Sequence, residues 1–174
     1  MLQGLMKISF SLAAALLSFS LIAWFDGGGT SIGISAEAGS LTVGGRRMSC
    51  GRGIAKNNPK MRSLGIAIPA KQVFFINKRL LRRYPAAFQR FVFLHECAHM
   101  YLRDERAADC WAIKRGLYRG LLSSGSVKQI CKALWNTPAG LYHFAGPQRC
   151  EHLKQCFAAA SKSRRGRKGR RKRR

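Results

Sequence analysis

The sequence predicts an α+β protein that is mainly helical and cross-linked by disulfide bonds. Helical patterns and capping signals cover much of residues 86–160, and two short β-branched and aromatic runs precede them. Six cysteines all follow residue 49, an even number that suits disulfides in an exported protein. The hydrophobic fraction of 47% excludes a wholly disordered chain and is sufficient for one core.

Residues 1–38 are expected to be an export signal. The run Ile8–Trp24 contains no charged residue, and its 17 residues fall short of a usual bilayer span. Ala36-Glu37-Ala38 has small residues at the spacing that a signal peptidase reads, so cleavage after Ala38 is expected. An uncleaved membrane anchor is the alternative. The protein is thus predicted to be periplasmic or secreted, or anchored if residues 8–24 are retained.

The next segments are predicted in chain order. Residues 39–63, rich in glycine and asparagine, are expected to form a loop held by Cys50. Two short strands and a helical turn should follow, and Pro85 suits the first turn of a longer helix. The expected elements are strands at 64–69 and 72–77, a turn at 78–83, and helices at 86–102, 105–115, 126–135 and 150–160. Residues 39–160 would form one domain.

The last fourteen residues, 161–174, include ten lysines and arginines and are expected to be a disordered basic tail. The whole chain carries a net charge of +25, which favours polyanionic partners. For an exported protein, the expected partner of the tail is the anionic envelope or membrane surface; nucleic acid is the second choice.

The acidic residues are few, and four of the seven fall within residues 96–109. Acids that serve solubility alone would be scattered, whereas a cation site or an acid–base site needs them together. The seven are Asp26, Glu37, Glu96, Asp104, Glu105, Asp109 and Glu151.

The sequence His95-Glu96-Cys97-Ala98-His99 has the HExxH spacing. On a helix, residues i and i+4 share a face, so His95 and His99 could bind one zinc ion, with Glu96 beside them as general base. Cys97 is two residues from each histidine and faces about 200° away, which argues against it as a ligand. It is expected to be half of a disulfide or a buried thiol.

Zinc needs a third protein ligand, and three downstream carboxylates, those of Asp104, Glu105 and Asp109, compete for that position. If the helix continued, Glu105 would lie about 240° around from His99 and could not reach the metal. The chain must therefore turn near residues 102–104, and Asp104 suits the N-cap of the next helix. Glu105 and Asp109 then share a face, so one can bind the metal while the other orients a histidine.

The segment Glu105-Arg106-Ala107-Ala108-Asp109 resembles the ExxAD element that follows HExxH in gluzincin metallopeptidases of the HtpX-like and CAAX-protease-like group. The resemblance implies a zincin-like helix pair beside a small sheet, with Glu105 as third zinc ligand and Asp109 supporting a histidine. The two elements are closer together here than is usual in that family. The short spacing is similar to the metzincin pattern HExxHxxGxxH, with Leu102 at the glycine position and Glu105 at the third histidine.

The sequence therefore predicts an exported zinc metallopeptidase that cleaves peptide or protein substrates with a zinc-activated water and Glu96 as general base. His143 and Arg149 are candidate oxyanion donors from a loop. Two alternatives remain: a basic, disulfide-bonded protein that binds the envelope or nucleic acid and has a non-catalytic metal site, or a metallohydrolase of another amide or ester.

Overall fold

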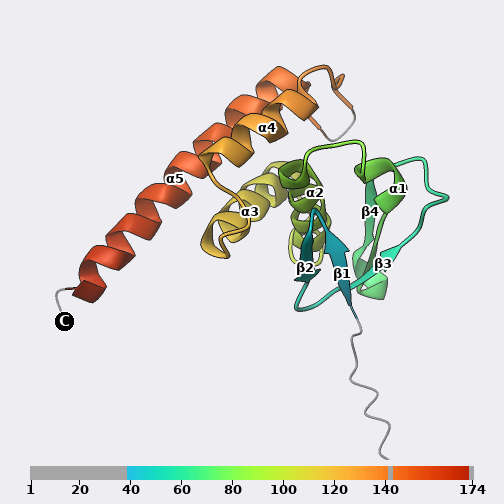
Figure 1. Cartoon of the computed structure of the whole chain (residues 1–174), viewed down its shortest axis with the longest axis horizontal. Coiled ribbons are helices and arrows are strands. Elements are labelled where there is room, and N and C mark those ends of the chain that lie inside the picture. Colours follow the sequence, from blue (N-terminus) through green and yellow to red (C-terminus); the bar gives the residue numbers. More distant parts are fainter. Residues whose placement is uncertain (1–38, 141–142, 173–174) are drawn as a thin grey trace, which may run out of the picture. The chain divides into compact units, whose positions relative to one another are not determined.

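A computed structural model describes residues 39–140 and 143–172, with side chains described as far as residue 166 (Figure 1). It has the predicted α+β class: mainly helical, with two small sheets and three disulfides. The predicted export signal lies outside the described residues. Within the described part, none of the helices is both long and apolar enough to cross a bilayer.

The first sheet is a hairpin of β1 (Ser40–Val43) and β2 (Arg46–Ser49). The prediction of a loop over residues 39–63 is wrong here and at β3 (Ile54–Asn57). Gly44 and Gly45 both have positive φ, of 55° and 73°, which allows the two-residue turn that pairs such short strands. The glycine pair is a sequence signal for a hairpin turn, but the residues on either side are too few and too polar to indicate strands.

The second sheet has the strand order β3-β5-β4, with β4 at Gly65–Ile68 and β5 at Val73–Ile76. The central strand β5 is parallel to β3 and antiparallel to β4, which leaves β4 at one edge. A 3₁₀ turn at Pro69–Lys71 joins β4 to β5. Both predicted strands are confirmed, and each is one residue shorter than predicted at each end.

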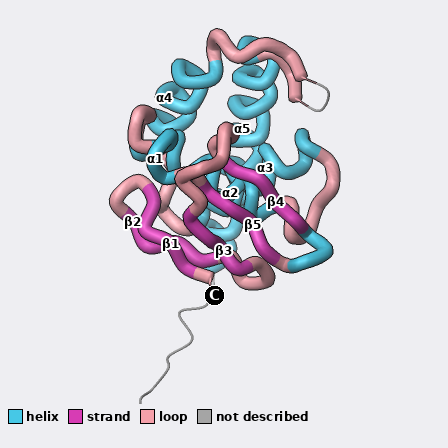
Figure 2. Tube along the Cα trace, turned by 90° about the vertical axis from the view of Figure 1, so that its right-hand side faces the viewer, coloured by secondary structure: helices cyan, strands magenta, loops and turns pink. Residues whose placement is uncertain are grey.

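Helix α2 (Ala86–Ala98) occupies the middle of the fold, after the short helix α1 (Lys78–Leu81). It contacts β4 and β5 on one side and α3 (Glu105–Tyr118) and α4 (Ser124–Leu134) on the other (Figure 2). The core lies along this helix, where Phe91, Phe93 and Leu94 are at most 1% exposed. Burial of these large side chains on two faces of α2 fixes its orientation relative to the sheet on one side and to α3 and α4 on the other.

The helix ends explain two differences from prediction. Helix α2 ends at Ala98, four residues early, because the chain turns at once toward α3. Helix α4 is capped by Ser123, whose side chain accepts from the Ser126 backbone N–H, while the Ser126 side chain accepts from the Ser123 N–H. Ser126, expected as the cap, is thus the reciprocal partner in a capping box.

Helix α5 (Gly146–Lys172) is much longer than the predicted helix over 150–160 and includes most of the segment expected to be disordered. Arginine and lysine are good helix formers, so the helix can continue once its first turns are packed. Arg164 Nη1 donates to the Leu117 carbonyl at 3.1 Å, and the Tyr118 hydroxyl bonds Ser163 Oγ at 3.2 Å. These contacts with α3 stabilise the start of the basic stretch.

Three disulfides join elements that are distant in sequence, which confirms the expected cross-linking. They pair Cys50 with Cys97, Cys110 with Cys156, and Cys131 with Cys150. The first ties the segment after β2 to the HExxH helix, and the other two tie α3 and α4 to α5. Cys97 therefore has the predicted role of a disulfide half.

Candidate metal centre

The two histidines of the motif meet at the C-terminal end of α2. His95 lies in the last turn of the helix and is 5% exposed, and His99 is its C-cap residue. Their Nε2 atoms are 3.1 Å apart. His99 Nδ1 is 3.2 Å from the Leu102 carbonyl, which fixes the ring and leaves Nε2 directed at His95.

The turn required by the helical-register argument is present after Ala98. The backbone N–H groups of Tyr101 and Leu102 both donate to the Ala98 carbonyl. Asp104 then caps α3, its Oδ1 accepting from the Ala107 N–H at 2.7 Å, as predicted. Glu105 is therefore the first residue of α3 and is brought back beside the histidines.

Glu105, and not Asp109, reaches the Nε2 atoms of both histidines. Its Oε2 lies 3.1 Å from His95 Nε2 and 3.4 Å from His99 Nε2. Asp109 instead faces the other ring nitrogen of His95, with Oδ1 2.9 Å from Nδ1. Of the two arrangements that the sequence left open, the geometry therefore has Glu105 among the donor atoms and Asp109 behind His95.

Arg149 holds Asp109 in this position. Arg149 Nε donates to Oδ2 at 2.8 Å and Nη2 donates to Oδ1 at 2.7 Å, a bidentate pair between buried side chains. Arg149 lies in α5 and not in the loop predicted for it. Two of its nitrogens are engaged by Asp109, and its suggested role as an oxyanion donor stays a prediction.

His143, the other candidate donor, does lie at the site. It belongs to the connection between α4 and α5, and its Nδ1 is 3.3 Å from Glu105 Oε2. The donor atoms of His95, Glu105 and His143 all lie within 4.8 Å of one another. Three buried atoms here, His95 Nδ1, Glu105 Oε2 and His143 Nδ1, find no hydrogen bond of acceptable geometry among the described residues. Buried polar atoms without partners suit a cation-binding role.

The spacing of the donor atoms fits a small tetrahedral metal ion. Bonds of about 2.0–2.1 Å at tetrahedral angles place neighbouring ligand atoms about 3.3 Å apart. The separations among His95, His99 and Glu105 are 3.1, 3.1 and 3.4 Å. Two imidazoles and a carboxylate at these distances form a candidate metal site, with His143 available as a further donor.

The charges of the site are strongly coupled. Burial alone would lower the pKa of His95, but hydrogen bonds with Asp109 and Glu105 outweigh it and raise the pKa to about 9. Burial alone would raise the pKa of Asp109, but the contacts with His95 and Arg149 lower it to about 2. The pKa of Glu105 is likewise lowered, because the histidines outweigh its burial. Cation binding at these atoms would therefore release a proton.

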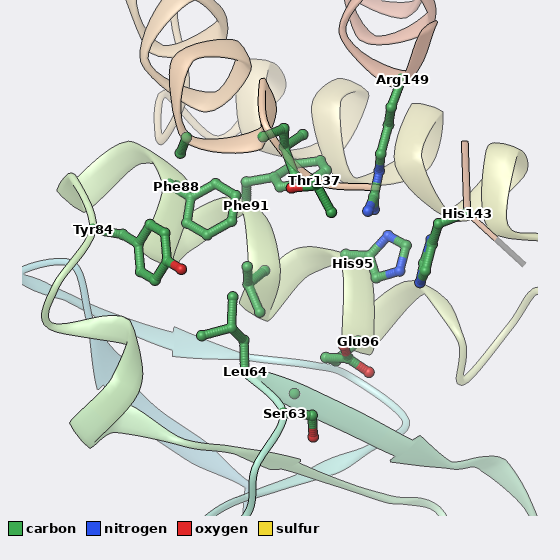
Figure 3. A pocket seen from close by; sticks show the side chains of 14 residues that line it. Ser63, Leu64, Tyr84, Phe88, Phe91, His95, Glu96, Thr137, His143 and Arg149 are labelled. Atoms are coloured by element: carbon green, nitrogen blue, oxygen red, sulfur yellow. The ribbon is translucent and has the colours of Figure 1, made fainter. Parts of the chain in front are cut away.

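Glu96 lines two cavities at the site, one together with His95 and the other together with His99 and Glu105. Burial raises the pKa of its carboxyl group to about 7, in the range expected of a general base. Gly65 of β4 packs directly on it: a Cβ atom at this residue would lie 2.6 Å from Glu96 Cγ and Oε1. Figure 3 shows Glu96 between His95 and the segment that carries Ser63 and Leu64.

A second group of metal-type side chains, Cys110, His152 and Cys156, was not identified from the sequence. His152 and Cys156 have the i, i+4 spacing that could have indicated it. His152 Nε2 lies 3.6 Å from each sulfur and 3.0 Å from the Arg106 carbonyl. The two sulfurs are joined in a disulfide, so they are not available as thiolate ligands.

Comparisons with protein-family models, curated proteins and solved structures returned no match for this chain.

Proposed function

We propose that this protein is a zinc-dependent hydrolase of peptide bonds. The observation that supports it best is the convergence of His95, His99 and Glu105, with Glu96 lining the adjoining cavities. Imidazole and carboxylate donors at tetrahedral spacing suit zinc, and three protein ligands leave one position for a catalytic water. The three disulfides support the proposal that the protein works in an oxidising compartment outside the cytoplasm.

In this proposal each side chain has a separate task. Zinc, when bound, lowers the pKa of water and polarises the scissile carbonyl group. Glu96 takes a proton from the attacking water and delivers it to the leaving amine, for which a pKa of about 7 is well placed. Asp109, whose Oδ1 lies 2.9 Å from His95 Nδ1, holds the ring with Nε2 toward the metal position, and Arg149 keeps Asp109 ionised.

The edge strand β4 offers a way to align an extended peptide. It pairs only with β5 in its sheet, and it contacts the HExxH helix. Gly65, Ile66 and Ala67 line a cavity together with His99 and Glu105. A peptide added to this edge would run past the donor atoms, with backbone hydrogen bonds supplying sequence-independent affinity.

Metal content and activity together test the proposal. Purified wild-type protein should contain about one zinc per chain, and Glu105→Ala should lose most of it. Asp109→Ala should retain zinc with an affinity lower by about 10–100-fold, the effect usual for a residue that orients a ligand. Glu96→Gln should keep full zinc content while losing peptide cleavage. A protein that binds no zinc when zinc is supplied would refute the proposal.

A second candidate function is favoured by His143. With Nδ1 3.3 Å from Glu105 Oε2, it could complete a closed four-ligand site, which is the arrangement of structural zinc. The protein would then be a metal-stabilised binding protein and not an enzyme. His143→Ala decides between them: zinc loss together with a large drop in thermal stability indicates the structural site. If His143→Ala retains zinc and is as stable as wild type, and if the wild type cleaves peptides, the site is catalytic.

A further inference from the structure

A cavity of about 340 Å³ extends from Glu96 and His95 along the side of α2. This is within the range of sites that hold small molecules or single side chains, about 300–1,000 Å³. Most of its walls come from α2, the end of α4 and the segment that leads into β4 (Figure 3). Tyr84, the connection between α4 and α5, and Arg149 of α5 complete the lining. The apolar lining residues include Leu64, Tyr84, Phe88, Phe91, Val92 and Leu134.

The cavity is positioned beside the reacting groups. His95 and Glu96 lie at one end, and Tyr84 and Phe88, with ring centroids 4.8 Å apart, contribute to the lining. A substrate residue next to the scissile bond would therefore direct its side chain into this space. The disulfide between Cys131 and Cys150 joins α4 to α5 and so links the α4 wall covalently to the helix that carries Arg149.

We propose that this cavity selects substrates that carry a large apolar side chain, such as phenylalanine or leucine, next to the cleaved bond. The inference rests on the proposed peptidase function. Burial of such a side chain against the aromatic and aliphatic walls contributes about 25 cal/mol of binding free energy per Å² of apolar surface.

Charged side chains should be rejected. The Arg149 guanidinium at the cavity is engaged by the Asp109 carboxylate through two hydrogen bonds. A lysine or aspartate side chain placed against the apolar walls would lose its hydration without an equivalent partner, which is costly. A lysine that reached Glu96 would also neutralise the proposed general base.

The size of the α4 wall provides the test. Ala133 lines the cavity, and Ala133→Phe would add a ring to it. The matched control is Ala159→Phe on the exposed face of α5. Zinc-loaded wild-type protein should cleave peptides with phenylalanine or leucine beside the scissile bond at least tenfold faster than peptides with alanine, lysine or aspartate there. Ala133→Phe should lose this preference and still cleave the alanine peptide, whereas Ala159→Phe should keep it.

A binding measurement separates the failure of this inference from failure of the peptidase proposal. Ligand-observed NMR with N-acetyl-phenylalaninamide should detect binding to metal-free wild type and to Ala159→Phe, with at least a tenfold loss in Ala133→Phe. If no peptide is cleaved but this binding pattern holds, the peptidase proposal fails and the apolar pocket stands. If peptides are cleaved without regard to the neighbouring side chain, or if Ala133→Phe binds the amide like wild type, the pocket inference is wrong.

Discussion

Substitution of Gly65 by alanine should disable the proposed general base and leave the fold and the metal donors intact. A Cβ atom at residue 65 would lie 2.6 Å from Glu96 Cγ and 2.8 Å from its Cδ. Restoring an ordinary carbon–carbon contact of about 3.5 Å requires the carboxylate to move by about 1 Å. A displacement of this size in a catalytic group typically reduces the rate by about 100-fold.

Stability should change little, because the backbone at Gly65 is not among the described glycines with positive φ. The atoms that must shift, Cγ, Cδ and Oε1, belong to one side chain and not to the backbone, and alanine suits a strand at least as well as glycine does. The assay is kcat/KM on a fluorogenic peptide, with zinc content and the thermal unfolding midpoint measured on the same preparation. Gly125→Ala in α4 is the matched control, since the nearest atom to its Cβ is 3.7 Å away.

The expected result is activity about 100-fold lower in Gly65→Ala, with zinc content and unfolding midpoint equal to wild type, and unchanged activity and zinc content in Gly125→Ala. Full activity in a zinc-loaded Gly65→Ala protein would refute the reasoning, because it would mean that the position of Glu96 does not limit the reaction.

Three further predictions concern the residues around the site. Asp104→Ala removes the cap of α3 and should lower the free energy of unfolding by about 1 kcal/mol, measured by urea denaturation. It should also weaken zinc binding, because Glu105 follows Asp104 directly. Unchanged zinc affinity would count against the cap as a positioning element. Asp109→Asn keeps the side-chain shape but loses the charge facing His95, and zinc affinity measured by chelator competition should fall about 10–100-fold. Replacing both Cys50 and Cys97 with alanine opens a loop with a sequence separation of 47, and the chain-entropy model gives a loss of about 4 kcal/mol in unfolding free energy. A loss below about 1 kcal/mol would show that the packing of α2 is sufficient without this disulfide.

The parts of the site that depend on local geometry could be predicted from the sequence. The helical register brings His95 and His99 together, and the same register requires the turn that returns Glu105 to them. The Asp104 cap and the disulfide role of Cys97 follow from equally short-range arguments. What these rules left open was the choice between Glu105 and Asp109, since it depends on how closely α3 docks against α2.

The remaining features depend on contacts between segments far apart in the chain. Arg149 lies 40 residues from Asp109, and only the docking of α5 on α3 pairs them. His143 reaches the donors for a similar reason, through the connection between α4 and α5. The β1–β2 hairpin was missed because its strands have four residues each and little apolar character. The helical start of the basic stretch depends on contacts with α3 that composition does not reveal.

The length of α5 separates the charge of its C-terminal end from the chemistry of the site. At about 1.5 Å per residue, the 23 positions from Arg149 to Lys172 extend about 34 Å along the helix axis. The Debye length at physiological ionic strength is about 8 Å, so the last basic residues contribute almost no field at the donor atoms. Adhesion of the basic end to an anionic surface should therefore weaken steeply with added salt, while turnover of an uncharged peptide should not. The two properties can vary independently of each other.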